Sequence, residues 1–272
     1  MSTEPASSSA SDGSLGVVLR TTPLRESDLV VVLYTDTHGR VSAVARGARK
    51  SQRRFAGALS LLVLGRFTLG RRPRGELWHL DRAEVVREWT ALATDVVAVA
   101  HASYVAELVG GLLPPEAPDP EALEIVVALW DSLAEGGPSP SALRWTELAL
   151  LDLGGHRPAI EACAACGQTD LATGTVFDPV RGGAICRACA AHSRGPGVRP
   201  LDPPTRGYLA ALAQLASPSD ARALDADPRF GAADRIAGRE CLVAMVTGLV
   251  GKPLRSLEYI AKLSAAARRS DG

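Results

Sequence analysis

The spacing of apolar residues changes once along this sequence, and that change limits the fold more than any other feature. From Leu15 to about Glu84, apolar residues alternate with polar ones in short segments, which is the two-residue period of a β-strand. From about Thr94 they recur at three- and four-residue steps, as over Val97–Leu112, which is the period of a helix. We therefore predict an α+β protein whose β-rich part comes first and whose second part is all-helical.

The β-rich part contains five strand-like segments, at residues 15–21, 29–35, 40–47, 59–69 and 76–81. Gly65 falls in the middle of the fourth segment, where a barrel strand bends or another backbone approaches closely. So many short strands suit a small closed barrel better than a sandwich, and the five-stranded oligonucleotide-binding (OB) barrel has this size. We predict an OB-fold β-barrel over residues 15–88.

Start and stop signals divide the helical part. Pro114 and Pro115 end its first helix, and Asp119–Pro120 has the N-cap and first-turn proline that begin the next one. Further helices are predicted over residues 141–153, 203–215 and 232–250. The resulting organisation is a disordered tail (1–14), the barrel (15–88), a helical domain in two parts (89–162 and 196–262), a Cys-bearing insertion (163–195) and a flexible C-terminus (263–272).

A run of positive charge occupies the middle of the β-rich part, although the whole chain is neutral. Residues 40–74 contain ten cations and no Asp or Glu. A basic run among short strands is typical of a surface that binds a polyanion, most commonly nucleic acid, although a solvated basic loop would look the same. The candidate nucleic-acid-binding residues are Arg40, Arg46, Arg49, Lys50, Arg53, Arg54, Arg66, Arg71, Arg72 and Arg74.

Charge and apolar runs also bear on the compartment. Residues 13–90 carry a net charge of +7 and residues 91–162 a net charge of −9, so a basic part is followed by an acidic one. The first fourteen residues lack the features of a signal peptide, and the apolar stretch Val96–Leu113 is interrupted by His101 and Glu107, which argues against a membrane span. Five cysteines without a secretion signal favour a reducing cytoplasm.

Four of these cysteines form the pattern C-x2-C-x19-C-x2-C, made by Cys163, Cys166, Cys186 and Cys189. This spacing is typical of a zinc site with four thiolate ligands, and four thiolates leave no open position for a catalytic water. We predict one structural Zn²⁺. Two redox pairs or four buried thiols are the alternatives, and His192 could replace one sulfur. Cys241 lies in an apolar helical segment and is expected in the core.

Catalytic motifs are absent from the sequence. Gly65–Gly70 has the glycine spacing of a phosphate-binding loop, but Arg71 and Arg72 stand where that motif needs Lys and a hydroxyl residue. The five histidines are scattered without a defensible pairing. The sequence therefore does not support ATP hydrolysis, and each histidine is expected at the surface or in the core and not in a catalytic site.

The order of these parts resembles the RecO family of bacterial recombinational-repair mediators. The resemblance rests on GARKSQRRFAGALSLL (47–62), RGELWHLDRAEVV (74–86), AHASYVAELVGGLLP (100–114), LALLDLGGHRP (148–158) with the two C-x2-C pairs, and GKPLRSLEYI (251–260). It covers residues 14–260. Two departures are the lack of the Gln-Pro that often precedes the family's fourth strand and His156 in place of an aromatic residue.

This resemblance implies a non-enzymatic protein, nucleoid-associated in the cytoplasm, that acts in DNA recombination and repair after DNA damage. It implies binding of single- and double-stranded DNA, strand annealing, and cooperation with RecR in loading RecA onto DNA coated by single-stranded-DNA-binding protein (SSB), whose C-terminal tail is a further expected partner. The zinc insertion would be structural.

Annealing without ATP requires neutralising phosphate repulsion, so five to eight contacts predict a salt slope of roughly −4 to −6 for single strands. Phe55, Phe67 and Trp78 are the aromatic residues near the basic run. Phe55 could stack on a base or, as we expect, anchor the loop to the barrel. Two other functions remain open: a zinc-bearing protein–protein adaptor that uses the acidic segment 91–162, and a zinc enzyme with an open coordination position.

Overall fold

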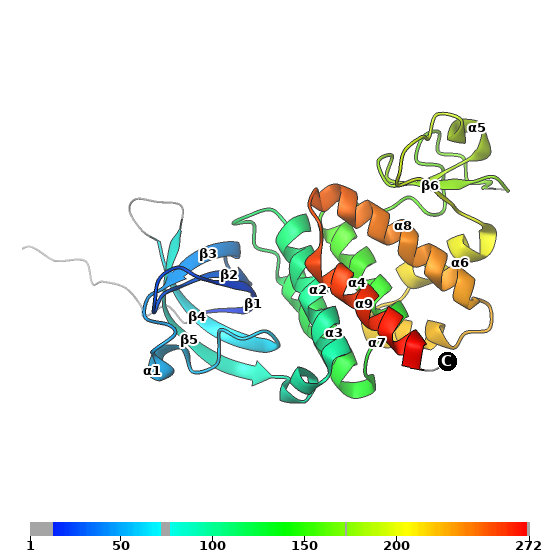
Figure 1. Cartoon of the computed structure of the whole chain (residues 1–272). Coiled ribbons are helices and arrows are strands. Elements are labelled where there is room, and N and C mark those ends of the chain that lie inside the picture. The colour runs from blue at the N-terminus through cyan, green and yellow to red at the C-terminus, as the bar shows by residue number, and fades with distance from the viewer. Residues whose placement is uncertain (1–12, 72–76, 172, 271–272) are drawn as a thin grey trace, which may run out of the picture. The chain divides into compact units, whose positions relative to one another are not determined.

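The computed structural model describes residues 13–71, 77–171 and 173–270. The chain forms two units, one up to Glu88 together with Pro115–Pro120, and one made of Trp89–Pro114 and the residues from Glu121 onward. Figure 1 shows the first unit as a β-barrel and the second as a group of helices with a small sheet. The return of Pro115–Pro120 to the barrel unit was not predicted.

The first unit is a closed five-stranded barrel with strand order β1-β2-β3-β5-β4. All neighbouring strands are antiparallel except β3 and β5, which are parallel. This confirms the predicted OB fold. The strands are β1 (Ser14–Pro23), β2 (Leu29–Thr35), β3 (Gly39–Ala45), β4 (Val63–Gly70) and β5 (Trp78–Glu88).

Apolar side chains that point inward from alternate strand positions fill the barrel. Val31, Leu33 and Phe67 are among the core residues that are completely buried. Gly65 lies where the pairing of β4 with β5 shifts register, and a Cβ atom there would lie 2.8 Å from the Phe67 ring. The strand therefore needs glycine at its bend, as the sequence predicts.

The fourth strand is shorter than predicted. We expected it over residues 59–69, whereas β4 begins at Val63 and the preceding residues form turns. Backbone hydrogen bonds from Ala58 to Phe55 and from Ser60 to Gly57 close these turns. The turns follow a single-turn helix, α1 (Gln52–Phe55), which the sequence did not indicate.

The second unit contains the predicted helices and several short ones. The long helix α2 packs against α4, α8 and α9. Asp95 caps α2 by accepting hydrogen bonds from the backbone N–H groups of Val97 and Ala98. The elements are η1 (Thr90–Thr94), α2 (Val96–Leu112), α3 (Pro120–Gly136), α4 (Pro140–Leu153), α6 (Pro203–Ala213), α7 (Pro218–Ala221), η2 (Arg222–Asp225), α8 (Ala232–Val250) and α9 (Arg255–Ser270).

The fifth strand, expected to end at residue 81, continues to Glu88 as part of β5. Two domain boundaries also differ from the expectation. A flexible C-terminus was expected over residues 263–272, whereas the helix α9 continues to Ser270. The cysteine insertion expected to end at residue 195 includes a third strand beyond it. Its sheet has the order β7-β6-β8, with β6 (Val176–Asp178), β7 (Gly183–Ile185) and β8 (Arg199–Pro200). The short helix α5 (Arg187–Ala190) lies between β7 and β8 in the sequence (Figure 1).

None of the helices in the described part of the chain is both long and apolar enough to cross a membrane.

Candidate nucleic-acid interface and metal centre

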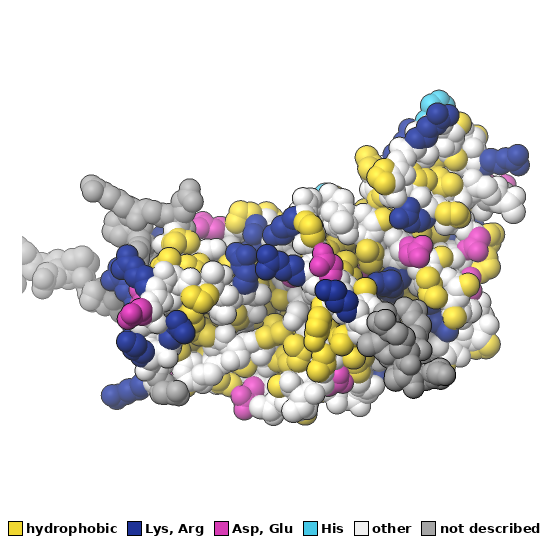
Figure 2. All heavy atoms as spheres, in the orientation of Figure 1, with side chains coloured by type: hydrophobic (Ala, Val, Ile, Leu, Met, Phe, Trp, Pro, Cys, Tyr) yellow, Lys and Arg dark blue, Asp and Glu magenta, His cyan; other side chains and the backbone are white. Residues whose placement is uncertain are grey.

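Five of the ten predicted cations lie together beyond the end of β3. They occupy the loop 46–51 and the helix α1 that follows it, and their side chains are exposed. Figure 2 shows Lys and Arg side chains gathered over the part of the barrel where Figure 1 places α1. We call this set the basic end: Arg46, Arg49, Lys50, Arg53 and Arg54.

The loop of the basic end is tied to the turn between β1 and β2. The backbone N–H of Gly47 donates to Oδ1 of Asp28 at 2.8 Å. The backbone N–H of Arg49 donates to the carbonyl of Ser27 at 3.1 Å, and its Nη1 donates to the carbonyl of Glu26 at 3.2 Å. The basic loop therefore has a defined conformation, because three hydrogen bonds connect it to the barrel.

The carboxylate of Asp28 is stabilised by these surroundings. The hydrogen bond from the Gly47 backbone is the main cause that lowers its pKa, and the positive charges of Arg25 and Arg46 lower the pKa further. Asp28 thus stays ionised beside the cations and faces the backbone of the loop.

Phe55 anchors the basic end to the barrel, as the sequence analysis expects. Its ring is 3% exposed and packs in the barrel core. Arg54 lies over this ring, with its guanidinium carbon 5.0 Å from the ring centre, and it donates to the carbonyl of Arg46. Within the described residues, the side chains of Arg46, Lys50 and Arg53 form no hydrogen bond or ion pair.

The aromatic residues near the basic run are not available for stacking on bases. Phe55 is 3% exposed, Phe67 is fully buried and Trp78 is 9% exposed. Recognition at this end of the barrel would therefore depend on charge, because base stacking needs an exposed aromatic face.

Three other predicted residues lie elsewhere on the barrel. Arg40 is at the start of β3, and Arg71 follows the end of β4, so both are at the strand ends opposite the basic end. Arg66 is on β4, where it donates to the carbonyl of Gly13 at 3.0 Å. The described cations therefore do not form one continuous surface. The length of β3 separates Arg40 from the basic end, and β4 lies between the basic end and Arg71 in the chain. Arg72 and Arg74 lie outside the described residues.

Arg71 is engaged by an acidic residue that the sequence analysis did not identify. Its Nη2 lies 3.0 Å from Oε2 of Glu116, and its guanidinium lies over the ring of Trp78. Oε1 of Glu116 accepts from the indole N–H of Trp78 at 3.0 Å. These interactions lower the pKa of Glu116, chiefly through the Trp78 hydrogen bond. The charge of Arg71 is thus already balanced within the barrel unit.

This difference predicts unequal effects of two single substitutions. Arg53→Ala should weaken binding of single-stranded DNA by about fivefold at about 0.1 M salt, since one phosphate contact contributes about 0.7 to the salt slope. Arg71→Ala should weaken it by less than about twofold because its charge is balanced. Fluorescence polarisation with a labelled oligonucleotide measures both. A loss for Arg71→Ala as large as that for Arg53→Ala would place the opposite end of the barrel in the interface.

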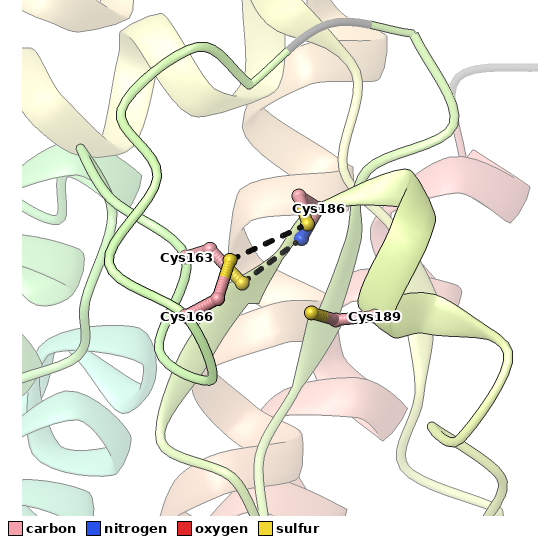
Figure 3. A group of neighbouring side chains, drawn as sticks. All are labelled: Cys163, Cys166, Cys186 and Cys189. Carbon is pink, nitrogen blue, oxygen red and sulfur yellow. Dashed lines mark hydrogen bonds between the residues drawn. The ribbon is translucent and has the colours of Figure 1, made fainter.

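The four cysteines of the C-x2-C pairs come together in the second unit. Their four Sγ atoms all lie within 4.8 Å of one another. Figure 3 shows Cys163 and Cys166 on one loop facing Cys186 and Cys189, which precede and belong to α5. Gly167, with φ of +75°, permits the tight turn after the first pair, and its N–H donates to the carbonyl of Cys163 at 2.8 Å.

The geometry of this cluster fits a metal ion better than disulfides. All four cysteines are free, and the sulfurs of Cys166 and Cys186 are 3.8 Å apart. A disulfide needs about 2.05 Å. Four thiolates about 2.3 Å from a tetrahedral zinc ion would lie about 3.8 Å from one another. The cluster therefore has the size of a four-thiolate site.

Backbone donors support thiolates in the cluster. Burial of Cys163 raises its pKa, but hydrogen bonds from the backbone of Cys186, Ala165 and Cys166 outweigh burial and lower the pKa to about 6. The Cys186 N–H lies 3.3 Å from this sulfur. For Cys189, the interaction with Cys186 is the main cause that raises its pKa to about 12. Four sulfurs this close cannot all ionise without a cation, which is the condition that a bound metal satisfies.

The other candidate ligands are not in the cluster. His192 is not among the metal-binding group found in the described residues, which consists of cysteines alone. Cys241 is fully buried in α8, as the sequence analysis predicts for a core residue.

The fold and these two sites define a class of protein: an OB barrel with a cluster of exposed cations, joined to a helical unit that carries a four-cysteine centre. The chain matches the family descriptions "Recombination protein O N terminal" over residues 14–89 and "Recombination protein O C terminal" over residues 93–258. It belongs to the RecO family of DNA repair proteins.

Individual relatives agree with this assignment. The chain is 41% identical to "DNA repair protein RecO" of Anaeromyxobacter sp. (strain K) over 246 residues, which cover 90% of this chain and 94% of the relative. It is 38% identical over 176 residues to the protein of that name from Geobacter sulfurreducens, covering 65% of this chain and 72% of the relative. It is 33% identical over 265 residues to the protein of that name from Symbiobacterium thermophilum, covering 92% of this chain and 97% of the relative.

Proposed function

We propose that this protein is a recombination mediator that binds single- and double-stranded DNA through the basic end of its barrel and promotes annealing of complementary strands. With RecR, it would assist the loading of RecA onto SSB-coated DNA, and the SSB C-terminal tail would be a further contact. It acts by binding and not by catalysis, on the chromosome in the cytoplasm. Membership of the RecO family supports this proposal.

The observation that carries the DNA-binding part is the basic end itself. Five cations project from one loop and one helical turn, and no described carboxylate forms an ion pair with them. Asp28, in the adjoining turn, accepts a hydrogen bond from the loop backbone with its carboxylate. A surface of this kind lowers its electrostatic free energy by binding a phosphate chain and releasing counterions.

The same arrangement suits annealing. Two complementary strands repel each other through their phosphates, and cations on one strand's backbone reduce this repulsion. Because Phe55, Phe67 and Trp78 are buried, they do not compete for the bases. The bases of the bound strand would then stay available to pair with a second strand.

We propose one Zn²⁺ per chain in the four-cysteine centre. Cys163, Cys166, Cys186 and Cys189 would hold the ion, and four thiolates would complete its coordination. Such an ion stabilises the fold of the residues that bind it and supplies no catalytic position. The role of the centre is therefore to hold β6, β7 and α5 together.

A salt series tests the DNA-binding proposal. The affinity for a labelled single-stranded oligonucleotide should fall with a slope of about −3.5 in log K against log salt, because five contacts contribute about 0.7 each. Sequence dependence should be weak, since charge and not base contact supplies the affinity. Binding that is absent at low salt would instead support the adaptor function, in which the protein contacts other proteins and not DNA.

A further inference from the structure

The turn beside the basic end carries two acidic residues, Glu26 and Asp28, and only the carboxylate of Asp28 forms a hydrogen bond with the basic loop among the described residues. Asp28 ends the turn between β1 and β2, and the positive charges of Arg25 and Arg46 are close enough to lower its pKa. Charge alone would make this residue unfavourable for a polyanion site, because a carboxylate repels phosphate. Its hydrogen bonds indicate another role.

The carboxylate is bonded to the backbone where the basic loop begins. Oδ1 of Asp28 accepts the N–H of Gly47 at 2.8 Å. Gly47 has φ of +67°, a left-handed conformation that glycine adopts readily, and its carbonyl accepts the N–H groups of Lys50 and Ser51 at 3.1 and 3.0 Å. Fixing Gly47 therefore fixes the closed turn that carries the cations.

The remaining contacts between the turn and the loop use backbone acceptors. The carbonyls of Ser27 and Glu26 accept hydrogen bonds from Arg49. The turn is itself closed by the N–H of Leu24, which donates to the carbonyl of Asp28 at 3.0 Å. Among these contacts, the Asp28 carboxylate is the side-chain acceptor that a substitution can remove while leaving the turn backbone in place.

We propose that Asp28 is a positioning residue for DNA binding, whose carboxylate holds the basic loop in the conformation that presents its cations to the phosphate chain. This inference rests on the proposed function of the basic end. It leads to an unusual expectation: removing a negative charge from a DNA-binding surface should weaken DNA binding.

Three variants separate positioning from charge. Asp28→Ala removes the acceptor and the charge, whereas Asp28→Asn removes the charge and keeps an oxygen that can accept the Gly47 N–H. Glu26→Ala is the matched control, because it removes a charge from the same turn and the Glu26 carboxylate forms no hydrogen bond with a described residue. Each full-length variant is measured for oligonucleotide affinity across a salt series and, without DNA, for the rate of trypsin cleavage within residues 46–54.

The positioning role predicts a specific pattern. Asp28→Ala should raise the Kd by about two- to tenfold, the factor for one ordinary hydrogen bond, and make the salt slope less negative. Trypsin should cleave its loop faster, while its thermal unfolding midpoint measured by circular dichroism should stay close to that of the wild type. Asp28→Asn and Glu26→Ala should bind DNA at least as tightly as the wild type.

Other patterns overturn the inference. If Asp28→Ala binds as tightly as Asp28→Asn, or if cleavage of its loop is unchanged, the carboxylate does not position the loop. Faster cleavage with an unchanged Kd would show that Asp28 orders a loop that does not contact DNA, which also rejects the role. A wild-type protein that fails to bind the oligonucleotide would be a failure of the proposed function, and the cleavage rates would still report on the Asp28 contact.

Discussion

Replacing Arg49, Lys50, Arg53 and Arg54 together by Ala is expected to abolish most of the DNA affinity. Four lost phosphate contacts should make the salt slope less negative by about 2.8, which corresponds to a loss on the order of a few hundredfold at about 0.1 M salt. The fold should persist because these side chains are exposed, and exposed substitutions usually change stability by less than about 0.5 kcal/mol each. Fluorescence polarisation across a salt series measures both the affinity and the slope.

A charge-preserving variant is the control for this experiment. Changing Arg49, Arg53 and Arg54 to Lys keeps the net charge of the basic end and should retain a salt slope close to that of the wild type. A moderate loss of affinity is expected, because Lys does not reproduce the fork of N–H donors. If the Ala variant remains folded and binds DNA like the wild type, the basic end is not the DNA site.

Removal of the cysteine centre is expected to have the largest effect on stability. The double variant Cys163→Ser, Cys186→Ser should lose the bound metal, from one Zn²⁺ per chain to none by elemental analysis. A structural zinc ion typically contributes on the order of 10 kcal/mol to the folding of a small metal-binding region, so the insertion should unfold. Trypsin should then cleave after Arg181 and Arg187, while cleavage within the barrel should keep its wild-type rate because the barrel is a separate unit.

Cys241→Ala is the matched control for the loss of a buried thiol. Cys241 is fully buried in α8 and lies outside the metal-binding group. The variant should keep one Zn²⁺ per chain and lose only modest stability, since a small apolar replacement leaves a small cavity. A double variant without zinc whose insertion remains resistant to trypsin would contradict a structural role of the metal.

Elements with strong local patterns were predictable from the sequence. The helix Ala232–Val250 has the predicted bounds, and the four cysteines form one cluster. Both features depend on the spacing of residues that are close in sequence: the apolar residues of a helix and the two cysteines of each C-x2-C turn. The OB barrel followed from the number and length of the strands, and the structure confirms it.

Features that depend on contacts distant in sequence were not predictable. Pro115–Pro120 belongs to the barrel unit, where Glu116 balances Arg71. Asp28 approaches Gly47 only because β2 and β3 pair in a register that places Leu29 opposite Ala45. A count of charges along the chain treats all ten cations alike, whereas the barrel separates the five of the basic end, which follow β3, from Arg40 and Arg71 at the opposite strand ends.

The most direct test of the central claim is photo-crosslinking to labelled single-stranded DNA. A benzophenone amino acid is placed at position 50 in the basic end or at position 37, an exposed position in the β2–β3 turn at the opposite strand ends. The account predicts a strong salt-sensitive crosslink from position 50 and little from position 37. Equal crosslinking from both positions, or crosslinking from position 37 alone, would contradict it.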